Sequence, residues 1–445
     1  MSVTSVVWLA AFAVGCISSF SQPILAMLVY LMDYYEHPPL RWWGSHLPDL
    51  RWGVLTSGVL LLVNLLKGRS PFSSEVMTNP ATRWLFIFFG ITVIVTPFGV
   101  SVDRSLHYVV DLAKLVLLYT LIIVSVRSRN HFRLFLLVMI VGSFLWGFDS
   151  WLDPSRSHGR LERVGGPDSF NDNSAAAHLL PLLPILPLFI FKGPKWWWRI
   201  GCLAAAPFIV NTIILCNSRG ATLAVASMAG YALVFARGRV RLLVIAMIVA
   251  GGVAAAFLVD QPFIERQLST IDYEEDGSAM GRIDSWKGAL HLMADHPLGT
   301  GGGGFDILSP IYIPLIVEAH GGEERAVHNT YLWVGSDWGF VGLFFFLMFI
   351  FATLRELRRI GRRATNELHY LECFTLEIGF IGFLVAAFFI NRPYAEMLYW
   401  IAGLTGALRH IQRTEAEAAA IPALKGAASR DPSALAPVPS TASGA

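Results

Sequence analysis

Residues Leu242–Leu258 read LLVIAMIVAGGVAAAFL, and this stretch decides the class of fold because it contains no charged side chain. A helix needs about 20 predominantly apolar residues to cross a bilayer, and the window 240–259 has that length. The same pattern recurs along the chain, with further apolar centres at Leu134–Trp146, Leu203–Leu215 and Val341–Phe351. The sequence therefore predicts a helical membrane protein.

The composition supports this class. The chain of 445 residues is 54% hydrophobic and 15% charged, whereas a soluble domain carries about 25% charged residues. The net charge of +2 gives no indication of a nucleic-acid partner. The four cysteines lie in or beside apolar blocks, which is typical of small buried hydrophobic residues and not of a disulfide or metal framework. The first apolar block lacks the features of a cleaved signal peptide and is expected to be a retained anchor.

Apolar windows predict an all-α polytopic fold with about twelve transmembrane helices. The stretch 5–36 is counted as one crossing broken at Pro23, and two crossings there would give thirteen. The other windows lie near 52–67, 83–99, 108–126, 131–150, 174–192, 197–216, 218–236, 240–259, 328–352, 370–390 and 395–410.

The distribution of lysine and arginine predicts the orientation, because cytoplasmic loops are enriched in these residues. The basic side carries Lys67, Arg69, Arg83, Arg127, Arg129, Arg133, Lys192, Lys195, Arg199, Arg237, Arg239, Arg241, Arg355, Arg358, Arg359, Arg362 and Arg363. The opposite, periplasmic side receives 36–51, 100–107, 151–173, 217–219, 260–327 and 391–394, and its short loops are poorer in arginine although they contain Arg41, Arg51, Arg104 and Arg392. We expect one transmembrane domain, 1–411, and a disordered cytoplasmic tail, 412–445, rich in Ala, Pro and Ser.

The long outer loop 260–327 contains an acidic run, Asp272–Asp276, and few basic residues. Within it, Arg282–His296 has apolar residues at helical spacing, which predicts a helix that lies on the membrane surface or caps the bundle. The apolar positions are Ile283, Trp286, Leu290 and Met293.

A glycine run, Gly301–Gly304, follows Pro297-Leu298-Gly299-Thr300. Glycines allow backbone amides to approach a ligand closely. A flexible turn explains the run equally well.

Arginines in the outer segments are candidate anion ligands. Arg219 is predicted near a helix N-terminus, a position that suits phosphate, although an arginine at a membrane surface can simply extend toward water. Arg160 and Arg163 stand beside paired glycines. They can hold an anion, or form surface ion pairs with Asp153, Glu162 or Asp168.

His328 opens the apolar window that begins His328-Asn329-Thr330-Tyr331, and it is therefore expected at the outer membrane boundary. A histidine there can take a proton from a hydroxyl group near neutral pH. An interfacial histidine that is merely hydrogen-bonded to a neighbour is the alternative.

Taken in order, these pieces resemble the O-antigen ligase and polymerase superfamily, bacterial inner-membrane enzymes of the C-type glycosyltransferase architecture. The resemblance is strongest over about 155–345. Its elements are Arg282-x-x-x-Trp286, Asp295-His296-Pro297-Leu298-Gly299-Thr300-Gly301, His328-Asn329-x-Tyr331-Leu332 and Gly339-Phe340-Val341-Gly342. The stretch Asp33-Tyr34-Tyr35-Glu36-His37-Pro38 also resembles a ligase subgroup linked to exopolysaccharide loci.

The resemblance implies a reaction on the periplasmic side: a glycan passes from undecaprenyl pyrophosphate to a hydroxyl group of the lipid A core, without a metal or another cofactor. By matching position, His328 would be the general base, Arg219 and Arg282 would contact the diphosphate, and Arg160 or Arg163 would be a third anion contact. An O-antigen polymerase and a protein O-oligosaccharyltransferase remain alternatives, because the motifs do not separate the acceptors.

A transporter or flippase is the rival from another class, because ionisable residues inside a helix bundle are typical of transport pathways. The residues concerned are Asp111, Lys114, Asp337 and Glu377, and Asp111 and Lys114 are close enough in sequence to pair. The chain shows no obvious internal repeat, and the outer loop with its candidate site residues favours an enzyme.

Overall fold

The computed structural model describes residues 2–153, 155–157, 160–161, 164–169, 171–268 and 277–430. Over these residues the protein is helical apart from one antiparallel pair of two-residue strands, β1 (Arg156–Ser157) and β2 (Arg160–Leu161). Eight helices in this part of the chain are long and apolar enough to cross a membrane. The predicted all-α polytopic class is therefore confirmed, whereas the number of crossings stays a prediction.

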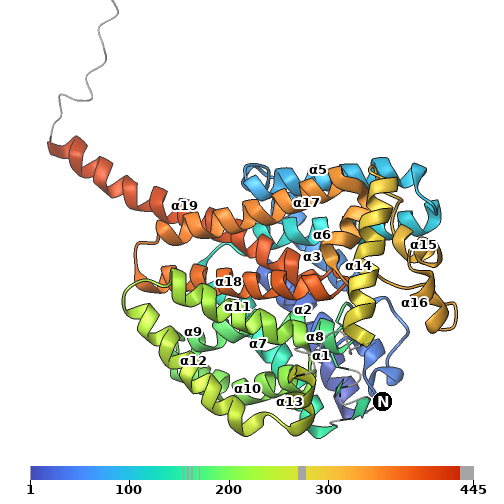
Figure 1. The fold of residues 1–445 in the computed structure, drawn as a ribbon. Helices are drawn as coiled ribbons and strands as arrows, with labels where there is room; N and C mark the ends of the chain where they lie inside the picture. Colours follow the sequence, from blue (N-terminus) through green and yellow to red (C-terminus); the bar gives the residue numbers. More distant parts are fainter. Residues whose placement is uncertain are drawn as a thin grey trace, which may run out of the picture.

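The helices follow one another along the chain with short connections (Figure 1). In order they are α1 (Val3–Ser19), α2 (Pro23–Tyr35), η1 (Pro38–Leu40), η2 (Gly44–His46), α3 (Trp52–Leu66), α4 (Ser74–Met77), α5 (Pro80–Val95), η3 (Thr96–Phe98), α6 (Val102–Ser125), α7 (Arg129–Leu152), α8 (Asp172–Leu179), α9 (Leu182–Lys192), α10 (Trp196–Leu215), α11 (Arg219–Phe235), α12 (Arg239–Leu258), α13 (Gln261–Leu268), α14 (Gly277–Asp295), α15 (Gly304–Tyr312), α16 (Pro314–Ala319), α17 (Thr330–Arg362), α18 (Glu367–Ala386), η4 (Ala387–Phe389) and α19 (Glu396–Arg430).

The first apolar stretch forms two helices with the break just before Pro23, and whether they make one crossing or two stays a prediction. Pro23 begins a second helix, α2, which turns back along α1. Gly15 of α1 packs against Val29 of α2, since a Cβ atom at Gly15 would lie 2.4 Å from the Val29 side chain. A proline at the first position of a helix is compatible with its missing N–H, so Pro23 starts a helix here and does not interrupt one.

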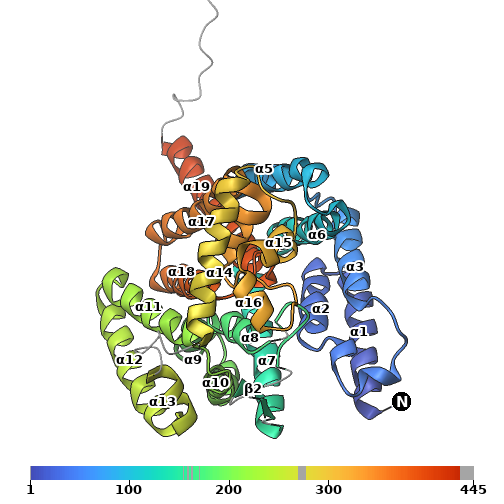
Figure 2. The same ribbon diagram turned by 45° about the vertical axis from the view of Figure 1, so that its right-hand side comes forward.

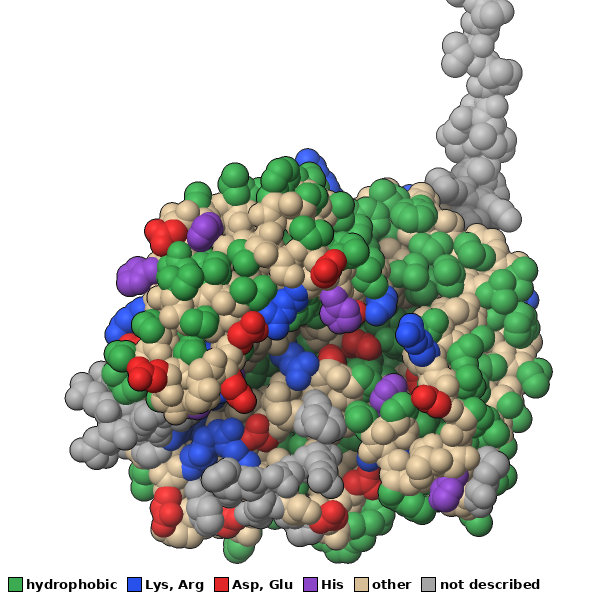
Figure 3. All heavy atoms as spheres, turned by 90° about the vertical axis from the view of Figure 1, so that its right-hand side faces the viewer, with side chains coloured by type: hydrophobic (Ala, Val, Ile, Leu, Met, Phe, Trp, Pro, Cys, Tyr) green, Lys and Arg blue, Asp and Glu red, His purple; other side chains and the backbone are tan. Residues whose placement is uncertain are grey.

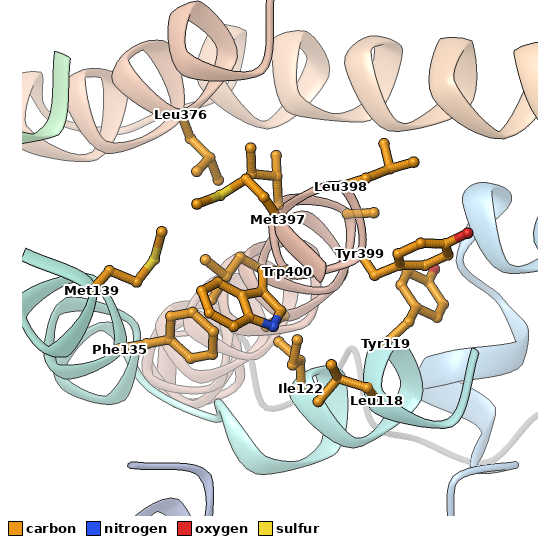
Figure 4. Close-up of a cluster of buried hydrophobic side chains, with 14 of the residues drawn as sticks. Leu118, Tyr119, Ile122, Phe135, Met139, Leu376, Met397, Leu398, Tyr399 and Trp400 are labelled. Carbon is orange, nitrogen blue, oxygen red and sulfur yellow. The ribbon is translucent and has the colours of Figure 1, made fainter. Parts of the chain in front are cut away.

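The core of the bundle is built around α19. Its residues Met397–Trp400 are fully or almost fully buried and face side chains of α6, α7 and α18 (Figure 4). Gly403 allows this close packing, because a Cβ atom there would lie 2.9 Å from Ile122 of α6. Beyond Ile411 the helix leaves the core and its side chains are exposed from Arg413 to Ala420.

The expected tail 412–445 is described only in part. Helix α19 continues into it as far as Arg430, through a stretch rich in alanine and glutamate, which are strong helix formers; the expected disorder of the tail stays a prediction. Residues 431–445 lie outside the described part of the chain.

Contacts between loops bring the predicted basic side together at one end of the bundle. They join loops that are far apart in sequence, and two of them use the buried Glu372. They are Arg127–Glu75 (2.8 Å), Arg129–Glu372 (2.9 Å), Arg133–Glu372 (2.7 Å), Lys192–Glu367 (3.4 Å) and Arg237 over the ring of Tyr370 (5.6 Å). The five short basic loops of the sequence therefore meet at a common face, which we call the basic end.

The segments predicted on the other side meet at the opposite end, here called the outer end. The contacts that join them are Arg104–Glu324 (2.7 Å), Arg41–Asp149 (2.5 Å), Asn329–Asn391 (3.0 Å) and Arg392–Ser174 (2.9 Å). Helices α14, α15 and α16 lie at this end, on the right of Figure 1 and in front of the bundle in Figure 2. The alternation of loops between two ends thus agrees with the sequence.

Helix α14 caps the outer end, as one of the two alternatives for Arg282–His296 predicted, and it runs across the direction of α17 and α18 (Figure 1). Its inward face agrees with the predicted one at Met293, which is buried, and at Ile283 and Trp286, which are half-buried, but not at Leu290. Leu290 is 54% exposed, whereas Ala289 and Leu292 are fully buried. The reason is Gly288, whose lack of a side chain lets α14 approach Tyr312 and Ile313 closely.

Candidate functional site

The outer end is hollowed. Figure 3 shows it face-on, with basic, acidic and histidine side chains gathered around a depression in the surface. The segments that meet here are the starts of α8, α11 and α17, together with α14 and the chain between η4 and α19. Most of the predicted site residues lie in these segments.

His328 lies where predicted, immediately before α17. Asn329 is the N-cap of that helix, and its side chain accepts hydrogen bonds from the amides of Tyr331 and Leu332. His328 itself has a φ of 54°, and in the described residues only Asn217 (φ 46°) shares a positive φ among non-glycine residues. Both residues directly precede an N-cap residue at the outer end, and unfavourable backbone conformations of this kind cluster at functional sites.

The electrostatic surroundings keep His328 neutral. Burial and the positive charges of Arg282 and Arg325 lower the pKa of His328 from 6.5 to about 4. At neutral pH the imidazole is therefore unprotonated, which is the form that accepts a proton. Arg325 is one of the few basic residues of the long outer loop, but the sequence analysis did not assign it to the site.

Arg282 and Arg219 are linked through a common set of contacts. Trp286, one turn after Arg282 on α14, lies against Phe389 with 6.1 Å between ring centroids. Phe389 also packs on Gly220, where a Cβ atom would lie 2.9 Å from its side chain. The part of α14 that follows Arg282 and the start of α11 that carries Arg219 thus both contact Phe389.

Arg219 is the first residue of α11, as predicted, and Ser218 is the N-cap whose side chain accepts from the amide of Ala221. The Nε of Arg219 donates to the carbonyl of Arg266 at 3.0 Å. This contact ties the end of α13 to the start of α11.

Arg160 lies on β2 and donates to Asp172 in the first turn of α8, at 2.7 Å. This partner is none of the three acidic residues expected from the sequence; Asp168 instead accepts from Tyr34 and from the amide of Glu396. Arg163, Glu162 and the acidic run 272–276 lie outside the described residues.

The glycine run has a structural role that differs from both expectations, a backbone that approaches a ligand and a flexible turn. Residues 297–303 fit into a kink of α17 at Gly339, whose φ of 72° and ψ of 178° are accessible to glycine only. We call this contact between 297–303 and 336–340 the glycine junction. Its hydrogen bonds are Gly301 N to Asp337 O (2.9 Å), Thr300 N to Ser336 O (3.0 Å), Phe340 N to Pro297 O (3.0 Å) and Gly303 N to Asp337 Oδ2 (2.8 Å).

The ionisable residues that suggested a transporter have structural partners. Asp111 pairs with Lys114 at 2.8 Å. Asp337 accepts from the glycine junction. Glu377 accepts from Arg358 at 2.6 Å. Such closed pairs are typical of structural contacts and do not favour a transport pathway through the bundle.

A metal site has no candidate in the part of the chain that is described, since no group of three or more His, Cys, Asp or Glu side chains gathers there. The acidic run 272–276 falls outside it. Metal independence therefore stays a prediction.

These features define a polytopic membrane protein with a hollow at one end of its helix bundle, surrounded by basic, acidic and histidine side chains. Residues 202–347 of the chain match the family described as O-antigen ligase. This segment contains Arg219, Arg282 and His328, and the match confirms the resemblance found in the motifs over its length. Comparison with curated proteins gives no match. The family supports glycan transfer of the O-antigen ligase or polymerase type.

Proposed function

We propose that this protein is a ligase that transfers a glycan from undecaprenyl pyrophosphate to a hydroxyl group of the lipid A core, at the periplasmic face of a bacterial inner membrane. The family match supports the general reaction. The lipid donor and the acceptor come from the resemblance. The side follows from the positive-inside rule, which assigns the basic end to the cytoplasm and leaves the hollow in the periplasm.

The observation that carries the proposal is the position of His328, directly before the N-cap of α17 at the outer end and close enough to Arg282 for that charge to lower the pKa of the imidazole. Transfer forms a bond between the acceptor oxygen and the anomeric carbon of the glycan and breaks the bond from that carbon to the pyrophosphate. The acceptor proton goes to His328, and the electron pair of the broken bond leaves with the diphosphate. Arg219 and Arg282, with Arg160 or Arg163, stabilise the growing negative charge.

The donor itself improves the base. Two of the causes that hold the pKa of His328 low are the charges of Arg282 and Arg325. A bound diphosphate offsets these charges and so raises the pKa of the imidazole toward its usual range. His328 is then a stronger base when the donor is bound than in the empty site. The imidazole therefore accepts the acceptor proton most readily when the donor is in place.

The test is transfer by purified protein in liposomes that contain an undecaprenyl pyrophosphate-linked glycan. Three acceptors are offered separately: lipid A core, a second lipid-linked glycan and an acceptor protein. We expect product on the lipid A core. Product on the lipid-linked glycan would make the protein a polymerase, product on the protein would make it a protein O-oligosaccharyltransferase, and an unconsumed donor with all three would refute glycan transfer.

The same assay tests metal independence. We expect an unchanged rate in the presence of a chelator. If the chelator abolished transfer and magnesium or manganese restored it, the arginine-based mechanism would be wrong. The acidic run 272–276 would then be the candidate ligand set, and a metal-dependent oligosaccharyltransferase would be the better comparison.

A further inference from the structure

The chain between η4 and α19 is fastened directly to the residues around His328. The amide of Asn329 donates to Asn391 Oδ1 at 3.0 Å. The hydroxyl of Thr330 donates to the carbonyl of Ile390 at 2.7 Å and accepts from the amide of Arg392 at 2.9 Å. Arg392 is therefore fixed beside the start of α17. The two residues that hold it and its neighbours, Asn329 and Thr330, directly follow the proposed base His328.

The guanidinium of Arg392 reaches from there to α8. Its Nε donates to Ser174 Oγ at 2.9 Å. Ser174 lies in the first turn of α8, close to Asp172, which binds Arg160. Arg392 thus connects the surroundings of His328 with those of the predicted anion contact Arg160.

The charge of Arg392 is the feature without a structural explanation. Its hydrogen-bond partner, the Ser174 hydroxyl, is neutral, and within the described residues no carboxylate lies within ion-pair distance of the guanidinium. Arg392 is nevertheless half-buried. A partly buried charge without a counter-ion is costly, and the cost is recovered when an anion binds.

Arg41 shows what a purely structural arginine at the same end looks like. It is also half-buried, but it donates to Asp149 at 2.5 Å, to Glu36 at 3.4 Å and to the carbonyl of Tyr35 at 2.9 Å. Its charge is neutralised inside the protein. The contrast between Arg41 and Arg392 points to a ligand for the latter.

We propose that Arg392 is a phosphate-binding residue of the site, whose guanidinium takes a phosphate group of the substrate next to His328. The inference rests on the proposed function and adds a residue to it. The phosphate belongs either to the diphosphate of the donor or to a phosphorylated acceptor, and both present anionic phosphate oxygens to an arginine.

Binding and stability separate a ligand contact from a structural one. Farnesyl diphosphate serves as the probe and farnesol as its uncharged control, with wild type, Arg392→Gln, Arg392→Lys and Arg41→Gln compared. We expect Arg392→Gln to bind farnesyl diphosphate about 10- to 100-fold more weakly, with farnesol binding and the melting temperature of the empty protein unchanged. Arg392→Lys should recover part of the affinity. Arg41→Gln should melt lower and bind like wild type.

If Arg392→Gln bound farnesyl diphosphate like wild type and melted lower, as Arg41→Gln should, Arg392 would be structural and the inference wrong. Transfer by the same variants identifies the phosphate: a raised KM for the donor assigns it to the donor diphosphate, a raised KM for the acceptor assigns it to the acceptor, and two unchanged KM values refute the inference. A wild-type protein that binds the probe through Arg392 yet transfers no glycan would refute the proposed function alone.

Discussion

His328 and Arg282 are expected to divide the chemistry between them. Replacing His328 by Ala removes the proton acceptor and should lower turnover about 10²- to 10⁴-fold with donor binding nearly intact. Replacing Arg282 by Ala removes a charged contact to the diphosphate and should cost about 2–4 kcal/mol, seen in donor binding, turnover or both. Both quantities are measured on the same purified variants.

His320 provides the matched control for His328, because it lies in the same outer segment but is exposed and bonded only to the carbonyl of Ile316. His320→Ala should transfer at the wild-type rate. Near-normal transfer by His328→Ala would exclude it as the base, and the carboxylates of the outer end would be examined next.

The low pKa of His328 predicts the pH dependence of the free enzyme. Protonated His328 cannot accept a proton, so kcat/KM should fall as the pH drops through the pKa, which is about 4. Arg325→Gln removes one positive neighbour and therefore raises this pKa, so the acid limb should move to higher pH. The measured quantity is the pH at which kcat/KM falls to half its maximum, and it does not depend on the size of that maximum.

Lys287→Gln is the control for this shift, because Lys287 is exposed and paired with Asp284 on the same helix as Arg282. Its acid limb should coincide with that of wild type. An Arg325→Gln limb at or below the wild-type position would contradict the electrostatic argument.

The places of His328 and Arg219 in the fold could be predicted from the sequence because the signals are local: each stands next to an N-cap residue, Asn329 or Ser218, at the start of an apolar window. Arg392 could not be found in this way. Its neighbour Asn391 meets Asn329 across 62 residues of chain, so the proximity to His328 exists only after folding. The partner of Arg160 was missed although Asp172 is near in sequence, because the chain turns before α8.

At the level of elements, the glycine junction should depend on the absence of side chains. A Cβ atom at Gly299 would lie 2.5 Å from the carbonyl oxygen of Asp337, and one at Gly339 would lie 2.4 Å from the carbonyl carbon of Leu298. Both positions have positive φ, which costs a residue with a side chain about 1–2 kcal/mol before any clash. Gly299→Ala and Gly339→Ala should each lower the melting temperature and the transfer rate.

Gly90 of α5 is the comparison for these two glycines, because a Cβ atom there meets nothing within 4 Å. Gly90→Ala should leave stability unchanged or raise it slightly, as alanine favours a helix. Gly299→Ala with wild-type stability would show that the junction accommodates a side chain, and the argument from close backbone contact would be wrong.

The sequence predicted most elements correctly, since every apolar window from 52–67 onward contains a helix. Its errors share a physical cause. Periodicity weights large apolar side chains, so it placed Leu290 on the buried face of α14, where Gly288 and Ala289 make the closest approach. The same limitation hid the glycine junction, whose two halves are separated by more than thirty residues and contain little apolar surface.

For the whole molecule, the orientation in the membrane can be tested by thiol labelling. Cysteine at Glu323, exposed at the outer end, should react with an impermeant reagent in intact spheroplasts, and cysteine at Thr365, exposed at the basic end, should react only after lysis. Cys16 is replaced by Ala in both variants, since it is half-buried whereas the other three natural cysteines are buried. The reverse pattern would invert the topology and remove the periplasmic site.

The glycine junction also bears on how relatives of this chain should be compared. Gly299, Gly301 and Gly339 are required by the contact between a loop and a kinked helix, so selection should keep them even where the sugar, the lipid or the acceptor has changed. A glycine that is invariant in an alignment at one of these positions would then indicate a requirement of the fold and not of the substrate. Substrate preference should be sought in columns that vary together with the chemistry of the donor, and not in these.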